Sequence, residues 1–148
     1  MLFRSGLDLI ANRNQVEKIM KKLSGSGIVI SLFIDPDCEQ IETAHALGAQ
    51  AIEIQTARYS EAKTKVSIDR ELDELREATR FARDLGLHVH MGHGLNYHNV
   101  QEVAAIYGVE ELNIGHSIIS RAVLLGFDRA VKEMKSAIAD GVASRVKR

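Results

Sequence analysis

The chain has 148 residues, a formal net charge of −1, 45% hydrophobic residues and 26% charged residues. This length suits one domain with a sizeable core, so we expect residues 1–148 to form a single domain. Mixed charge without a basic stripe argues against nucleic acid as a partner, and no apolar run approaches the roughly 20 residues that cross a bilayer. With one cysteine and no signal-peptide pattern at the N-terminus, we expect a cytoplasmic protein.

The apolar pattern predicts one helix followed by four strand–helix units. The first helix begins with Asn14 as its cap, and Asp37 with Gln40 three residues later forms a capping-box pattern for the second. Later helices follow from apolar residues at helical spacing, and Gly126 separates a short helix from a long final one. The predicted strands cover about 28–34, 51–56, 87–91 and 111–114.

Strands that alternate with helices predict an α/β fold with a parallel sheet. An open flavodoxin-like sheet and part of a (β/α)8 TIM barrel both fit this pattern. The short extra helix after the last strand favours the barrel, because barrels often bind phosphate between their last loops and such a helix. A whole barrel typically needs about 250 residues. With about four βα units preceded by one helix, the chain accounts for about half of a barrel.

Two Gly-His pairs stand where short apolar strands end. One is in Met91-Gly92-His93-Gly94, and the other is in Gly115-His116-Ser117. Because parallel strands end at one edge of a sheet, we expect both loops to meet there. The glycine amides and imidazoles predict a site for phosphate binding and proton transfer.

Four runs carry a family resemblance: SLFIDPD from Ser31, IEIQTARY from Ile52, GHGLNYHNV from Gly92 and ELNIGHSIISRAV from Glu111. In this order and spacing they closely resemble pyridoxine 5′-phosphate synthase, an enzyme of vitamin B6 biosynthesis. The resemblance implies a TIM barrel with extra helices, a homo-oligomer, and no metal or redox cofactor. It implies condensation of 1-deoxy-D-xylulose 5-phosphate with 3-amino-2-oxopropyl phosphate, which are small phosphorylated substrates.

The resemblance also implies residue roles. His93 resembles the proton donor of the family, Gly94 a backbone contact to the ligand, and Gly115 with His116 the pair that holds phosphate. Glu53 resembles the carboxylate that stabilises the transition state. The plainer interpretation is that Glu53 is a buried carboxylate paired with Arg or Lys, and that His93 is only a turn residue hydrogen-bonded to backbone.

The chain also differs from the family. Gln55-Thr56-Ala57 stands where the family has His-Thr-Gly, and His90-Met91 stands where Asn-Ala is usual. The resemblance covers the C-terminal half of the family, so the N-terminal proton acceptors have no counterpart. We expect a second copy or a complementing N-terminal half to complete the barrel. The alternative function is a catalytically incomplete half-barrel that retains only phosphate binding or oligomeric assembly.

A third interpretation concerns metal. His88 and His90 share a strand face and, with His93, His116 and Glu53, resemble a His-x-His metal site. However, His88 should lie about 6 to 7 Å below His90 along the strand, since strands rise roughly 3.3 Å per residue. We therefore expect no metal site.

Overall fold

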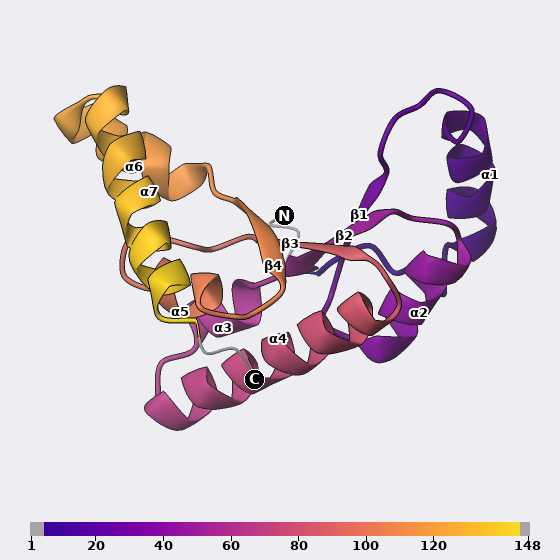
Figure 1. Ribbon diagram of the computed structural model, residues 1–148, viewed down its shortest axis with the longest axis horizontal. Helices are drawn as coiled ribbons and strands as arrows, with labels where there is room; N and C mark the ends of the chain where they lie inside the picture. Colours follow the sequence, from indigo (N-terminus) through magenta and orange to yellow (C-terminus); the bar gives the residue numbers. More distant parts are fainter. Residues whose placement is uncertain (1–4, 146–148) are drawn as a thin grey trace.

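The computed structural model describes residues 5–145, and these residues form an α/β fold (Figure 1). Four parallel strands lie in the order β1-β2-β3-β4, which is also their order in the chain. The predicted parallel α/β fold is therefore confirmed, whereas a flavodoxin-like sheet would need a reversal of strand order. The strands are β1 (Ser31–Ile34), β2 (Ala51–Gln55), β3 (His88–Gly92) and β4 (Val109–Asn113). The helices are α1 (Arg13–Leu23), α2 (Cys38–Ala46), α3 (Ala57–Glu61), α4 (Lys65–Asp84), α5 (Val100–Ala104), α6 (His116–Leu125) and α7 (Phe127–Ala143).

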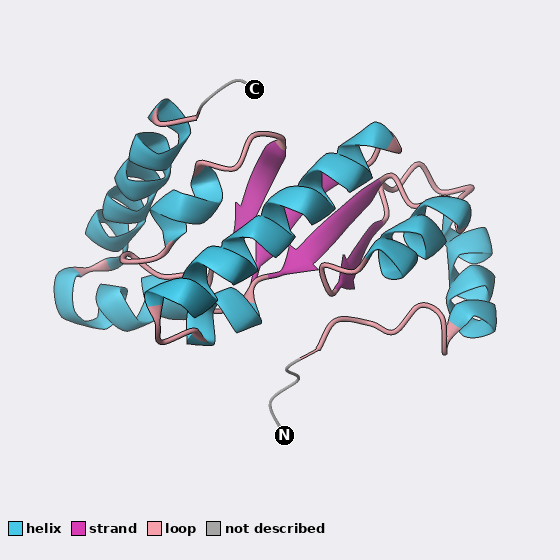
Figure 2. Ribbon diagram, turned by 90° about the horizontal axis from the view of Figure 1, so that it is seen from below, coloured by secondary structure: helices cyan, strands magenta, loops and turns pink. Residues whose placement is uncertain are grey.

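The two faces of the sheet differ in chemistry. Figure 2 shows the long helix α4 lying along the sheet, and on this covered side Ile34, Ile52 and Val89 are completely buried. Because side chains alternate along a strand, the residues between them point to the opposite face. One register row on that face runs across all four strands: Phe33, Glu53, His90 and Glu111. The apolar face therefore holds the core, and the opposite face carries the polar side chains that could form a functional site.

The pairing of β3 with β4 contains an irregularity. Val89 pairs with Val109, but the next residue, His90, pairs with Glu111. The register thus shifts by one residue at Glu110, as in a β-bulge. From this point to the ends of the strands the pairing is regular again.

The helix caps agree with the sequence in one case and differ in another. Asp37 caps α2 as predicted, because its side chain accepts hydrogen bonds from the backbone N–H groups of Glu39 and Gln40. The Gln40 side chain does not close the box, since its Oε1 accepts from Leu9 N at 2.8 Å. The prediction that Asn14 caps the first helix is wrong. The helix begins at Arg13 after Asn12.

The predicted strand bounds are shifted. Ile28 and Val29 were expected inside the first strand but are 60% and 68% exposed, and β1 begins only at Ser31. The reason is that β2 begins at Ala51, which pairs with Ser31, so the earlier residues have no strand partner in this sheet. The other strands begin or end one or two residues away from the predicted bounds. The sequence pattern missed the short helix α3.

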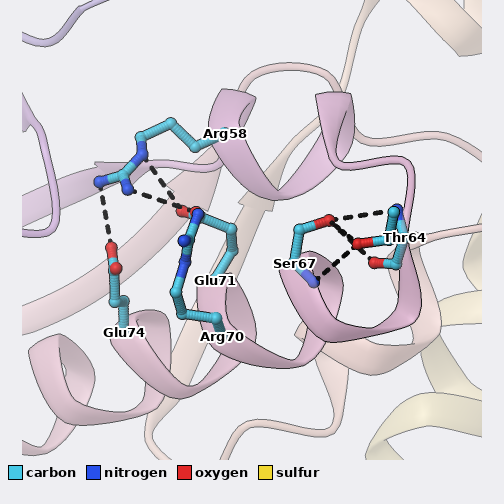
Figure 3. A network of polar contacts seen from close by, with 6 residues as sticks. All are labelled: Arg58, Thr64, Ser67, Arg70, Glu71 and Glu74. Carbon is cyan, nitrogen blue, oxygen red and sulfur yellow. Dashed lines mark hydrogen bonds and ion pairs between the residues drawn. The ribbon is translucent and has the colours of Figure 1, made fainter.

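A polar network fixes α3 against α4 (Figure 3). The Glu71 side chain is only 6% exposed and lies 3.2 Å from Arg58 Nε and 2.7 Å from Arg70 Nη2. Arg58 also reaches Glu74 at 3.1 Å, so one arginine of α3 bridges two carboxylates of α4. This network fixes the helix that follows β2, beside the carboxyl end of the sheet. Within residues 5–145, no helix has both the length and the apolar character that crossing a membrane requires.

Candidate functional site

One open cavity of about 640 Å³ collects all five residues that the sequence singled out: Glu53, His93, Gly94, Gly115 and His116. It lies at the carboxyl ends of the strands. The predicted meeting of the two Gly-His loops is therefore confirmed. The rest of the lining consists of Phe33, Leu95, Asn96, Asn113, Ile114 and Ser117.

Glu53 projects from the middle of β2 and reaches across the neighbouring strand. Its Oε2 accepts a hydrogen bond of 2.9 Å from Asn113 Nδ2 on β4. Partial burial raises the pKa of Glu53, and the Asn113 hydrogen bond and the charges of His90 and His93 oppose this shift by lowering it. Its hydrogen-bond partner is thus an amide, in place of the Arg or Lys that the plainer interpretation required.

Asn113 and Gly92 make this position of the carboxylate possible. A β-carbon placed on Gly92 would overlap Glu53 Oε1 and would lie 3.0 Å from the Asn113 carbonyl oxygen. Glycine at this point of β3 therefore leaves the room that the carboxylate needs. The Glu53 side chain can accordingly lie above β3 and meet β4.

His93 lies in an unusual backbone conformation. Its φ is +80°, and it is the one residue other than glycine with positive φ among residues 5–145. Gly94 follows with φ +82°, and a β-carbon there would lie 2.7 Å from the Ser60 side chain. The His93 ring lies 6.3 Å from the Phe33 ring, centre to centre, on the polar face. Strain of this kind persists where the surroundings hold it in place, and it concentrates at functional sites.

The loop that follows His93 is fastened to α3 and to α6. Tyr59 donates from its hydroxyl to the Asn99 carbonyl at 2.8 Å, and burial raises the pKa of Tyr59 to about 12. From α6, the Ser117 hydroxyl donates to the Leu95 carbonyl at 2.8 Å. This last bond joins the loops of the two Gly-His pairs directly.

Gly115 and His116 form the start of α6. Gly115 is the N-cap and has no side chain that could accept from the first helical N–H groups, while its carbonyl accepts the first helical bond from Ile119 N. Both residues are exposed in the cavity wall. The first N–H groups of a helix lack partners within the helix, and the helix dipole is positive at this end. The start of α6 therefore offers donors that suit an anion.

The structure also shows where the residues that differ from the family pattern lie. Gln55 is 3% exposed, and among the described residues its Nε2 has no hydrogen-bond partner. Ala57 is buried as the first residue of α3. His90 is the register partner of Glu53 on β3, and its Nδ1 lies 3.9 Å from Glu111 Oε1.

The histidines of β3 do not converge on one point. His88 Nδ1 lies 2.7 Å from Glu110, an exposed pair away from the cavity. Across residues 5–145, no three His, Cys, Asp or Glu side chains gather closely enough to hold a metal ion.

Sequence reasoning did not single out Asn113, Thr56 or Phe33. Asn113 stands beside Gly115 in the run ELNIGH, so its nearness to the Gly-His pair was the available signal. Its partner is 60 residues away in the chain, and only the strand pairing brings the two together.

Comparisons with known proteins show which family the chain resembles. The family model described as "Pyridoxal phosphate biosynthesis protein PdxJ" matches residues 3–140. The pyridoxine 5′-phosphate synthase of Syntrophotalea carbinolica is 52% identical over 133 residues, which are 90% of this chain and 56% of that protein. The synthase of a Synechococcus species is 53% identical with the same coverage. The chain thus spans about half the length of the curated relatives it matches.

A solved structure shows a similar fold. The crystal structure of the Amycolatopsis orientalis BexX/CysO complex superimposes with a TM-score of 0.58 at 14% sequence identity. The match covers 91% of this chain and 53% of that chain. At this identity the likeness concerns the fold alone. The family model and the identities near 50% show that the chain belongs to the PdxJ family of pyridoxal phosphate biosynthesis proteins.

Proposed function

We propose that this chain provides the phosphate-binding and proton-donating part of a pyridoxine 5′-phosphate synthase site. The observation that carries the proposal is the cavity that collects Glu53, His93 and the start of α6. It lies in a chain 52% identical to a synthase of that name. The reaction condenses 1-deoxy-D-xylulose 5-phosphate with 3-amino-2-oxopropyl phosphate and releases phosphate and water.

His93 and Glu53 have complementary tasks in this proposal. Closing a pyridine ring from two carbonyl compounds requires an imine, dehydrations and repeated proton transfer. An imidazole can both accept and donate a proton, so His93 can donate a proton to a leaving hydroxyl. Glu53, at the same cavity wall, stabilises positive charge that develops on nitrogen in the transition state. Its partial burial strengthens this electrostatic effect.

The phosphate group binds at the start of α6 in this proposal. The N–H groups after Gly115 and the His116 side chain donate to the phosphate oxygens, and the Gly94 backbone contacts the same ligand. The support is that all three residues line the cavity and that no side chain caps this helix. Small phosphorylated molecules are thus the proposed ligands, in preference to nucleic acid or membranes.

We further propose that residues 1–148 form one domain, the C-terminal half of a (β/α)8 barrel, and that a second copy or a complementing N-terminal half completes it. Four sequential parallel strands support this proposal, because they leave two outer edges. Exposed apolar side chains on α6 also support it: Val123 is 81% exposed and Leu124 is 82% exposed. A second copy or a complementing N-terminal half would cover these surfaces. We also propose that the protein acts in the cytoplasm.

The first test is turnover. The chain is incubated with both substrates, alone and with the part of the Syntrophotalea carbinolica synthase that it does not match, and pyridoxine 5′-phosphate is quantified. We expect product in the complemented mixture and its loss with His93→Ala. Light scattering shows whether two copies or two different chains assemble. Absence of product from a folded, assembled complex would contradict the proposed function.

A second candidate function is phosphate binding without turnover, and the start of α6 in the cavity wall, which no side chain caps, favours it. Titration with inorganic phosphate separates the two functions. Binding that is lost with His116→Ala, without product under any condition, would support a binding protein. Product formation would exclude it.

A further inference from the structure

The turn at His93 combines strain with a catalytic position. A residue with a β-carbon pays a steric penalty in the left-handed region, and histidine at φ +80° has to be held there by other contacts. Gly94 next to it also has positive φ, and a glycine backbone can adopt many conformations. The turn therefore needs contacts from other residues to hold its conformation.

Thr56 is the side chain that supplies such an anchor. It lies between β2 and α3 and is 1% exposed. Its Oγ1 lies 2.8 Å from the Gly92 carbonyl oxygen and 2.7 Å from the His93 carbonyl oxygen, and it donates its proton to this pair. The Thr56 backbone N–H donates to the same Gly92 carbonyl at 2.8 Å.

The neighbouring anchors of the turn are weaker. Ser60 Oγ reaches the His93 carbonyl only at 3.5 Å, and Asn99 Nδ2 reaches the Gly94 carbonyl at 3.3 Å. Both distances are long for hydrogen bonds, whereas those of Thr56 are short. Removing the Thr56 hydroxyl would take the short partner from the His93 carbonyl, whereas the Gly92 carbonyl would keep the Thr56 backbone N–H.

We propose that Thr56 is a positioning residue whose hydroxyl holds the strained turn and thereby aims the His93 imidazole into the cavity. It touches no substrate and acts through His93. Its role in turnover rests on the proposed function, but its hold on the turn does not.

The test compares three variants of the full chain. Thr56→Val removes the hydroxyl at nearly constant volume, and Thr56→Ser keeps it. Thr79→Val is the matched control, because Thr79 is also completely buried and also donates to a carbonyl, that of Leu75 within α4, at 2.7 Å. The NMR signals of the His93 ring and the Gly94 amide report the turn, with His93→Ala for assignment.

We expect Thr56→Val to shift or broaden both signals, and Thr56→Ser and Thr79→Val to leave them in place. In the complemented reaction, Thr56→Val should lower kcat by about 10- to 100-fold with little change in KM, because a misplacement of about 1 Å has this effect. The control should lose stability without this loss of kcat.

Two results would overturn the proposal. One is a Thr56→Val protein whose His93 and Gly94 signals match those of the wild type. The other is a folded Thr56→Ser protein in which both signals are displaced, and this result decides the matter even if the valine variant does not fold. If the wild type shows no turnover, the proposed function fails while the NMR comparison still decides the role of Thr56.

Discussion

Glu53 Oε1 and Gly92 share one space, since a β-carbon on Gly92 would overlap this carboxylate oxygen. The two residues belong to neighbouring strands, β2 and β3. Asn113 on β4 then binds the other carboxylate oxygen. The position of the Glu53 carboxylate therefore depends on the absence of a side chain at Gly92 on β3 and on the amide of Asn113 on β4.

Gly92→Ala should destabilise the protein by about 1–3 kcal/mol, because an extra methyl group forces Glu53 and Asn113 apart. Equilibrium unfolding in urea measures the loss. Gly25→Ala is the matched control, since nothing lies within 4 Å of a β-carbon at Gly25. An equal effect of both substitutions would contradict the overlap.

Glu53→Gln should stabilise the folded state, and increasingly so as the pH rises. The folded-state pKa of Glu53 is raised above 4.5, so its contribution to stability is present below this pH and is lost as the pH rises through the raised pKa. Glutamine does not titrate and escapes this loss. Unfolding free energies at several pH values from 4 to 7 test the prediction.

Glu133→Gln is the control of opposite sign for this series. Hydrogen bonds from Arg129 and Arg121 lower the pKa of Glu133, so its contribution is present above 4.5 and is lost as the pH falls through the lowered pKa. Its replacement should destabilise the protein at neutral pH and matter less in acid. Parallel pH profiles for the two variants would show that the sign given for Glu53 is wrong.

Asn113→Ala should raise the pKa of Glu53 further, because it removes the hydrogen bond that favours the charged carboxylate. Titration of the Glu53 carboxyl carbon by NMR measures the shift. Asn96→Ala is the control: Asn96 lines the same cavity, but its side chain accepts from His98 N. A Glu53 pKa that stays unchanged in Asn113→Ala would exclude the proposed electrostatic role of Asn113.

Glu71→Ala should destabilise the protein by about 1–3 kcal/mol, because it removes the buried acceptor that binds Arg58 and Arg70. Both arginines are more than half exposed, so they remain hydrated, and this limits the loss. Asp73→Ala on the same helix removes only an exposed pair with Arg76 and should cost less than about 0.5 kcal/mol. Urea unfolding compares the two. Equal losses would show that Glu71 does not fasten α3.

The sequence predicted the α/β fold well because its signals are local. Strand-like apolar runs, the Asp37 cap and the helical spacing that becomes α4 are all readable within a short window. The error at Ile28 and Val29 has a non-local cause, since β-branched residues form a strand only where a partner strand exists. The short helix α3 was missed because the contacts of Arg58 with α4 hold it in place.

Some residues of the candidate site could likewise be predicted from local sequence, and others could not. Glycine next to histidine at the end of a strand is a recognisable local pattern, so His93 and His116 were predictable. Their meeting in one cavity is confirmed. Thr56 and Asn113 carry common polar side chains with no local pattern. Their partners are more than 30 residues away and depend on the register of the sheet.

The register shift between β3 and β4 determines which side chain of β4 reaches the cavity. Because of the extra residue at Glu110, Asn113 is opposite Gly92, while Leu112 is opposite Met91 in the core. With regular pairing from Val109, the partner of Gly92 would be Leu112, and the amide of Asn113 would turn toward the helices. One additional residue in β4 thus places the hydrogen-bond donor Asn113 beside Glu53, where regular pairing would place the apolar side chain of Leu112.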